Sequence, residues 1–135
     1  MMAPSAVSAQ AIRAAWMVWL LAAAAGCGPA LPSDRAVVDR SWAAFKTRFI
    51  EPTGRVVRPE HDADSVSEGQ AYTMLRAVWM NDRETFDRVW RWASSHLGRQ
   101  GRDRASLWAW HWQDGGVSDW NVATDADTDA ALALI

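Results

Sequence analysis

Residues 66–79 read VSEGQAYTMLRAVW, and apolar side chains recur in them at the spacing of an α-helix. The stripe that we expect to be buried consists of Ala71, Met74, Leu75 and Val78. Ser67 is followed three positions later by Gln70, which is the pattern of a capping box. The helix is therefore expected to begin at Ser67, with Glu68 at its first helical position and its end near Met80.

A second segment repeats this arrangement. Thr124 precedes Asp125 and is followed three positions later by Asp127, which predicts the start of another helix. Asp125 lies 57 positions after Glu68, so each carboxyl is expected at the first turn of a separate helix. An acid at this place also has a structural explanation, because it meets the positive end of the helix dipole and stabilises the helix by roughly 0.3–1 kcal/mol.

Two further helices are predicted, from about Ser33 or Asp34 to before Pro52 and from about Arg83 to Leu97. Residues 51–66 and 98–106 are expected to be loops, and Leu107 to Trp112 form a short aromatic segment before a glycine turn. No series of strands is evident, so the predicted class is all-α, with helices paired as antiparallel hairpins. The helices that begin at Ser67 and Thr124 would then be parallel neighbours in an inner layer.

Length and composition point to one soluble domain. The chain has 135 residues, of which 50% are hydrophobic and 22% charged, and its formal net charge of -2 gives no support to a nucleic-acid partner. Residues 130–135 stay apolar to the end with no helix stop signal, so we expect a truncated domain. We expect a monomer.

The first 27 residues resemble an export signal. Arg13 is their only charge, and the apolar run after it is too short to span a bilayer. The small residues before Cys27 resemble a bacterial lipobox, which predicts a lipid on Cys27 and attachment to a membrane. The alternative is ordinary cleavage near this position. The protein is thus expected to be exported to the periplasm, the outer membrane or the medium, with residues 28–34 as a tether.

The aromatic segment suggests a sugar-binding groove. Trp108, Trp110 and Trp112 alternate along it, and aromatic faces stack on the C–H faces of pyranose rings. The helical Trp42, Trp79 and Trp90 are expected in the core instead. His111 is expected on the opposite side, packed or exposed, and His61 and His96 have no triad or metal spacing.

Two carboxyl groups that face one cavity are the minimum for acid/base cleavage of an acetal. A proton donor needs neighbours that keep it protonated, and Tyr72 or a second carboxylate could provide them. The pair Asp125 and Asp129 could instead hold magnesium for a diphosphate, although no basic partner segment is evident. Apart from that alternative, no metal or organic cofactor is expected.

The sequence around Glu68 resembles the catalytic-acid motif of glycoside hydrolase family 8, and residues 123–127 resemble the signature motif of that family. The similarity extends over residues 35–135, with the segments at 81–87 and 107–112 in the same order and spacing. It implies a partial (α/α)6 barrel and an inverting, endo-acting hydrolase of β-1,4-linked polysaccharide, most often cellulose.

The resemblance also implies roles for individual residues. Glu68 matches the proton donor, Asp125 matches the aspartate that holds the distorted sugar, and Trp112 or Trp110 matches a stacking residue. Tyr72 is expected beside the substrate, and Asp127 in a supporting role. The general base of the family would lie beyond Ile135, so we expect the isolated chain to be inactive.

Several departures and alternatives remain. Ala71 and Thr73 replace glycines that are common around the tyrosine, and Ala130 replaces a larger apolar residue. The substrate could be chitosan, xylan or mixed-linkage glucan, or the chain could be a glycan-binding fragment without catalysis. Glu68 and Asp125 would have to share one hollow for any hydrolase to result.

Overall fold

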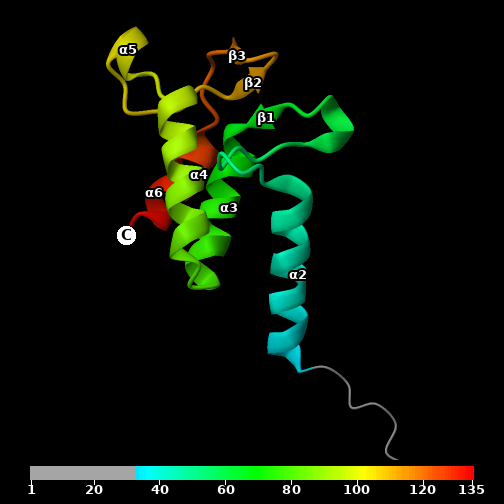
Figure 1. Cartoon of the computed structure of the whole chain (residues 1–135). Helices are drawn as coiled ribbons and strands as arrows, with labels where there is room; N and C mark the ends of the chain where they lie inside the picture. Colours follow the sequence, from blue (N-terminus) through cyan, green and yellow to red (C-terminus); the bar gives the residue numbers. More distant parts are fainter. Residues whose placement is uncertain (1–32) are drawn as a thin grey trace, which may run out of the picture. The chain divides into compact units, whose positions relative to one another are not determined.

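The structure is a computed structural model that describes residues 33–135. Its longer helices are α2 (Asp34–Phe49), α3 (Ser67–Trp79), α4 (Arg83–His96) and α6 (Thr124–Ala133). Short helical turns η1 (Pro59–His61) and α5 (Gln100–Asp103) lie in the connections, and the strands are β1 (Ser65–Val66), β2 (His111–Gln113) and β3 (Gly116–Asp119) (Figure 1). The four helices predicted from periodicity are confirmed, with ends within one residue where ends were predicted.

The expected export signal, the lipidation candidate Cys27 and residues 28–32 of the tether lie outside the described residues. None of the helices in residues 33–135 is long and apolar enough to cross a membrane.

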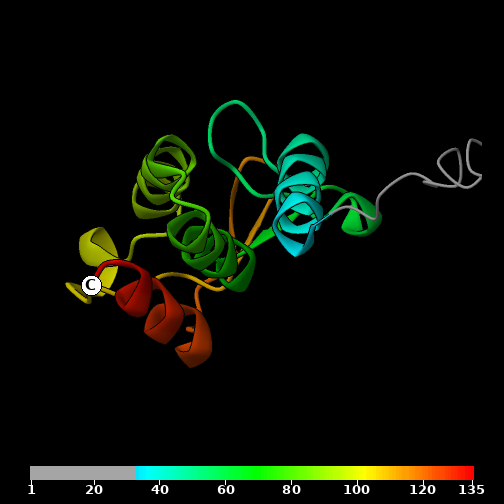
Figure 2. The ribbon, with the colours of Figure 1, turned by 90° about the horizontal axis from the view of Figure 1, so that it is seen from below.

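Helix α3 is the central element of residues 34–135. It packs against both α6 and α4, and Figure 2 shows it between these two helices. Ala71, Met74 and Ala77 have no exposed surface, since neighbours cover α3 on more than one side. Helix α6 presents Ala126, Ala130 and Ala133 to the core, and their small side chains allow the helices to approach closely. The predicted pairing of α3 with α6 is therefore confirmed.

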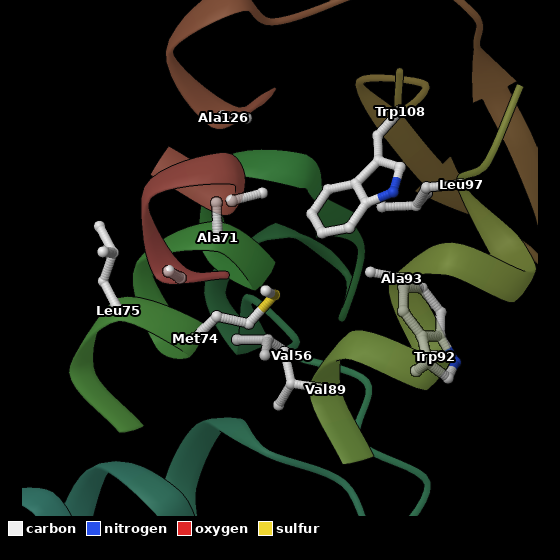
Figure 3. Close-up of a cluster of buried hydrophobic side chains, with 12 residues drawn as sticks. Val56, Ala71, Met74, Leu75, Val89, Trp92, Ala93, Leu97, Trp108 and Ala126 are labelled. Atoms are coloured by element: carbon white, nitrogen blue, oxygen red, sulfur yellow. The ribbon is translucent and has the colours of Figure 1, made fainter. Parts of the chain in front are cut away.

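The hydrophobic core lies between α3, α4 and α6. Figure 3 shows Met74 of α3 with Val56 and Val89 beside it, and Leu97 and Trp108 on the other side of the cluster. Val78 was predicted in this stripe, but half of its surface is exposed. Trp79 was also predicted to be buried and is 72% exposed, because α3 turns this side away from α4 and α6.

Helix α2 is held by polar contacts to the turn between α3 and α4. Trp42 is buried, and its indole N–H donates to Asp82 over 2.9 Å. The ammonium group of Lys46 donates to the same carboxylate oxygen over 2.7 Å. Asp82 is also the N-cap of α4, since its other oxygen accepts the backbone N–H of Thr85.

A small antiparallel sheet was not predicted. Its order is β1-β2-β3, and β1 pairs with β2 so that Ser65 lies opposite Trp112 and Val66 opposite His111. The sheet lies at the end where α3 begins, and the chain passes from β1 directly into α3 (Figure 1). It uses few residues, so the class remains predominantly helical.

The predicted capping boxes are wrong. The N-caps are Val66 and Ala123, and neither makes a side-chain capping bond; Ser67 and Thr124 are already the first helical residues. At α3 the sheet replaces the cap, because the backbone N–H of Ser67 donates to the carbonyl of Trp110 over 2.9 Å. Glu68 and Asp125 are consequently second residues of their helices.

Candidate active site

Glu68 lies at the start of α3, where two donors hold its carboxyl group. The indole N–H of Trp110 donates to Oε1 over 3.0 Å. The hydroxyl of Ser67 donates to Oε2 over 3.2 Å. Both oxygens are thus occupied by groups from the helix start and the aromatic segment, and the residue is half-buried.

Tyr72 lies one turn further along α3 and is 52% exposed. The negative charge of Asp125 raises the pKa of its hydroxyl, and partial desolvation, Asp129 and Glu68 add to this effect. Helices α3 and α6 pack against each other, so Glu68 and Tyr72 of α3 and Asp125 of α6 lie on two adjoining helices.

Asp125 and Tyr72 are both exposed. The hollow that Glu68 and Asp125 would have to share stays a prediction. Two surface hollows of about 460 and 500 Å³ lie near Asp82 and Arg83, at the opposite end of α3, and Glu68 lines neither of them.

Asp127 faces the aromatic segment. Its Oδ1 accepts the backbone N–H of Trp108 over 3.0 Å, while its Oδ2 is buried without a hydrogen-bond partner. Burial raises the pKa of Asp127, and the bond from Trp108 opposes this rise. The side chain thus positions residues 108–110, which fits a supporting role better than contact with a substrate.

The three tryptophans of the segment do not form one row. Trp108 is buried against Trp90, with ring centroids 5.7 Å apart. Trp112 packs edge-on against Trp92 and His96, at 5.6 and 5.1 Å. Of the three, Trp110 bonds to Glu68 through its side chain, whereas Trp108 bonds to Asp127 through its backbone. A β-bulge between His111 and Trp112 breaks the alternation on which the prediction relied.

A polar cluster around His111 was not predicted from the sequence. Its Nε2 lies 2.7 Å from Asp64, which is buried, and its Nδ1 lies 2.6 Å from the hydroxyl of Ser118. Arg58 forms a bidentate ion pair with the same Asp64. Asp64 is 47 residues from His111, and only the pairing of β1 with β2 brings them together, so no local spacing could indicate the contact.

In residues 33–135, no three His, Cys, Asp or Glu side chains are grouped so as to hold a metal ion. The diphosphate alternative therefore rests on the pair Asp125 and Asp129 alone.

Comparisons with known proteins identify the family of the chain. The family model described as Glycosyl hydrolases family 8 matches residues 6–135. The chain belongs to this family. The resemblance noted in the sequence motifs is thereby confirmed.

Curated relatives of this family 8 chain include two bacterial proteins. An endoglucanase of Cellulomonas uda is 37% identical over 105 residues, which cover 75% of this chain and 28% of the relative. A probable endoglucanase of Novacetimonas hansenii is 39% identical over 106 residues, covering 76% of this chain and 30% of the relative. The matched region of the chain thus spans about three tenths of the length of these relatives.

Solved structures give the same result for the fold. An endoglucanase from Klebsiella pneumoniae, described as a family 8 glycosyl hydrolase, is similar with a TM-score of 0.65 and 36% identity, over 71% of this chain and 31% of that one. An endo-beta-1,4-glucanase from Acetobacter xylinum gives a TM-score of 0.64 and 37% identity, over 72% of this chain and 30% of that one. The predicted helical fold, as part of a family 8 domain, is confirmed.

Proposed function

We propose that this chain carries the proton-donor half of an endo-acting, inverting hydrolase of β-1,4-glycosidic bonds in cellulose-type glucan. The observation that carries the proposal is that Glu68 and Asp125 stand at the starts of two packed helices, and that the charges of both raise the pKa of Tyr72. The names of the relatives support the substrate class, since they are endoglucanases.

Glu68 is the general acid in this proposal. It donates its proton to the glycosidic oxygen while the bond from that oxygen to the anomeric carbon breaks, so the leaving sugar departs as a neutral alcohol. A water molecule attacks the anomeric carbon from the opposite face and gives its proton to a general base, which inverts the configuration. Asp125 accepts hydrogen bonds from the sugar whose anomeric carbon becomes positive.

The aromatic residues bind the polysaccharide. Trp110 bonds to Glu68, and Tyr72 lies one turn further along α3, so both are candidates for stacking on the sugar. Trp112, which packs against Trp92 and His96, is a weaker candidate for this contact.

The general base lies, in our proposal, outside these 135 residues. An inverting enzyme needs it about 6.5–9.5 Å from the acid, with a water molecule between the two groups. We therefore expect the 135-residue chain alone to bind glycan at most. We also propose that the protein is exported and that a lipid on Cys27 attaches it to a membrane.

Glu68→Gln in the full-length protein tests the acid. The variant keeps the acceptor oxygen for Trp110 but has no proton to donate, so we expect reducing-sugar release from carboxymethylcellulose to fall by about 10²–10⁴-fold. Binding to the same polymer, followed by affinity electrophoresis, should be unchanged. An aryl glucoside with a good leaving group should lose far less activity, because that group departs without protonation. Wild-type turnover of carboxymethylcellulose by Glu68→Gln would refute the assignment.

Chitosan is the second candidate substrate, and one observation favours it. Asp129 adds a third negative charge to the surface around Tyr72, and a cationic sugar would gain from it. The same assay with chitosan and xylan in place of carboxymethylcellulose separates these substrates. Binding without release of reducing sugar from any of them would indicate a glycan-binding protein instead.

A further inference from the structure

Trp110 connects the proposed proton donor to the polar cluster around His111. Its indole N–H donates to Oε1 of Glu68, and its ring lies over the imidazole of His111 with centroids 5.0 Å apart and planes 32° apart. Its backbone is bonded on both sides, through the N–H of Ser67 and the carbonyl of Asn121. Because the backbone of Trp110 is fixed, the position of its indole is set by the contacts with Glu68 and with the imidazole ring of His111.

The imidazole of His111 is fixed through both nitrogens. Nε2 contacts Oδ2 of Asp64, Nδ1 contacts the hydroxyl of Ser118, and only 16% of the side chain is exposed. Neutral His111 donates from Nε2 and accepts the Ser118 proton at Nδ1. Protonated His111 donates from both nitrogens, and Ser118 then donates to the carbonyl of His111 over 3.3 Å. The ring is held in either protonation state.

Asp64 is fixed in turn by Arg58. The guanidinium donates to both carboxylate oxygens, and the Asp64 side chain is only 6% exposed. The bond from Arg58 lowers the pKa of Asp64, and the bond to His111 adds to this effect against the opposing cost of burial. The bond to Asp64 raises the pKa of Arg58, and the charge of Glu68 contributes as well, so Arg58 lies within electrostatic reach of the acid.

We propose that His111 and Asp64 are positioning residues for Glu68, because they hold the Trp110 indole that fixes its carboxyl group. This inference rests on the proposed function. The indole N–H at Oε1 can only donate, whereas the hydroxyl of Ser67 at Oε2 can also accept, so the transferable proton is kept on Oε2. Trp110 thus decides which oxygen of the acid faces the bond to be cleaved.

The test compares two leaving groups in the full-length protein. Trp110→Phe keeps an aromatic ring but removes the N–H, and His111→Phe keeps the ring beneath the indole but removes both hydrogen bonds. For each we expect kcat on an unactivated cello-oligosaccharide to fall about tenfold or more, with little change on a dinitrophenyl glucoside. His111→Gln, which can still donate to Asp64, should recover part of the loss. Trp120→Phe is the matched control, because that ring lies over Arg102 instead.

Equal losses on both substrates, or a Trp110→Phe variant that behaves like Trp120→Phe, would overturn the positioning role. If Glu68→Gln itself shows no selective loss on the unactivated substrate, the proposed function fails. If Glu68→Gln is selective and Trp110→Phe is not, only this inference fails.

A spectroscopic measurement tests the contact between Trp110 and Glu68 without an activity assay. In ¹⁵N-labelled protein, the indole N–H resonance of Trp110 should shift as Glu68 titrates, and this response should vanish in Glu68→Gln and weaken in His111→Phe. A resonance that titrates alike in wild type and Glu68→Gln would show that the indole does not sense the acid, and the inference would be wrong.

Discussion

Asp127 has two oxygen atoms in different surroundings. Oδ1 accepts the backbone N–H of Trp108, whereas Oδ2 is buried without a partner. A buried carboxylate with one unpaired oxygen costs free energy when it is ionised. The folded state therefore depends more on the hydrogen-bond acceptor of Asp127 than on its negative charge.

Exchanging Asp127 for asparagine and for alanine separates these contributions. The pKa of Asp127 is raised, so the folded state binds the proton more tightly and stability falls as pH rises from the unfolded pKa, about 4, through the folded value. Asp127→Asn retains the acceptor, and we expect its free energy of unfolding at pH 7 to equal or exceed wild type. Asp127→Ala leaves the buried N–H of Trp108 unpaired and should cost about 1–3 kcal/mol. Urea unfolding measures both, and a larger loss for asparagine than for alanine would contradict the argument.

Residue roles were only partly predictable. The sequence identified Glu68 and Asp125 as candidates from their place at helix starts, but it assigned Gln70 and Asp127 to capping boxes. Gln70 instead donates to the carbonyl of Val56 and Asp127 accepts from Trp108. Both side chains bind segments distant in sequence, which a local pattern cannot reveal.

At the scale of elements, the turn after α2 is packed directly on the backbone of α4. Gly54 has a φ of +95°, and a Cβ placed on it would lie 2.3 Å from the carbonyl oxygen of Arg88. That contact is with backbone, so neither partner can move aside easily. The turn and α4 approach one another as closely as glycine permits.

Gly54→Ala should therefore destabilise the protein strongly. We expect a loss of about 3 kcal/mol or more, from left-handed strain of about 1–2 kcal/mol and overpacking of about 1–3 kcal/mol. Gly115 in the turn between β2 and β3 is the control, since its φ is +81° but no atom lies within 4 Å of its Cβ position. Gly115→Ala should show the strain alone, about 1–2 kcal/mol. Thermal unfolding measures the stability of both variants. Equal losses in Gly54→Ala and Gly115→Ala would contradict the packing argument.

Element prediction succeeded for helices and failed for the sheet. Helices of ten or more residues contain enough repeats of the apolar stripe to identify them, and all four were predicted. The strands have two to four residues, too few for an alternating pattern. Their partners also lie far apart, as with Val66 and His111.

For residues 34–135 as a whole, Asp82 joins α2 to the hairpin of α3 and α4. Burial favours its neutral form, but hydrogen bonds from Lys46, the backbone of Thr85 and Trp42 together lower the pKa of Asp82 well below its usual value. A carboxyl with a lowered folded pKa stabilises the fold above its unfolded pKa, and this contribution is lost as pH falls toward the folded value.

We therefore expect stability to decline below about pH 4. Asp82→Asn should flatten this decline, because an amide does not titrate, while remaining an N-cap for α4. Asp103→Asn is the comparison: Arg99 lowers the pKa of that exposed carboxyl too, but solvent screens the pair, so its effect should be smaller. Denaturant unfolding from pH 2 to 7 measures the slopes. An unchanged slope in Asp82→Asn would show that another carboxyl governs acid unfolding.

The arrangement of the helices was predictable because four helical segments alternate with loops along the chain, and the family resemblance covered residues 35–135. Trp79 shows the limit of this reasoning, since its helical spacing predicted burial and most of its ring is exposed. Which side of a helix is covered depends on neighbours that periodicity alone does not specify.

Residues 108–110 make contacts to both α3 and α6. Trp108 donates its backbone N–H to Asp127 at the start of α6, and the carbonyl of Trp110 accepts from Ser67 at the start of α3. Three extended residues span at most about 10 Å, so this covalent spacer sets how far the two helix starts can separate. Inserting one residue here would change the distance between Glu68 and Asp125, whereas the exposed residues 101–104 tolerate added length without altering it.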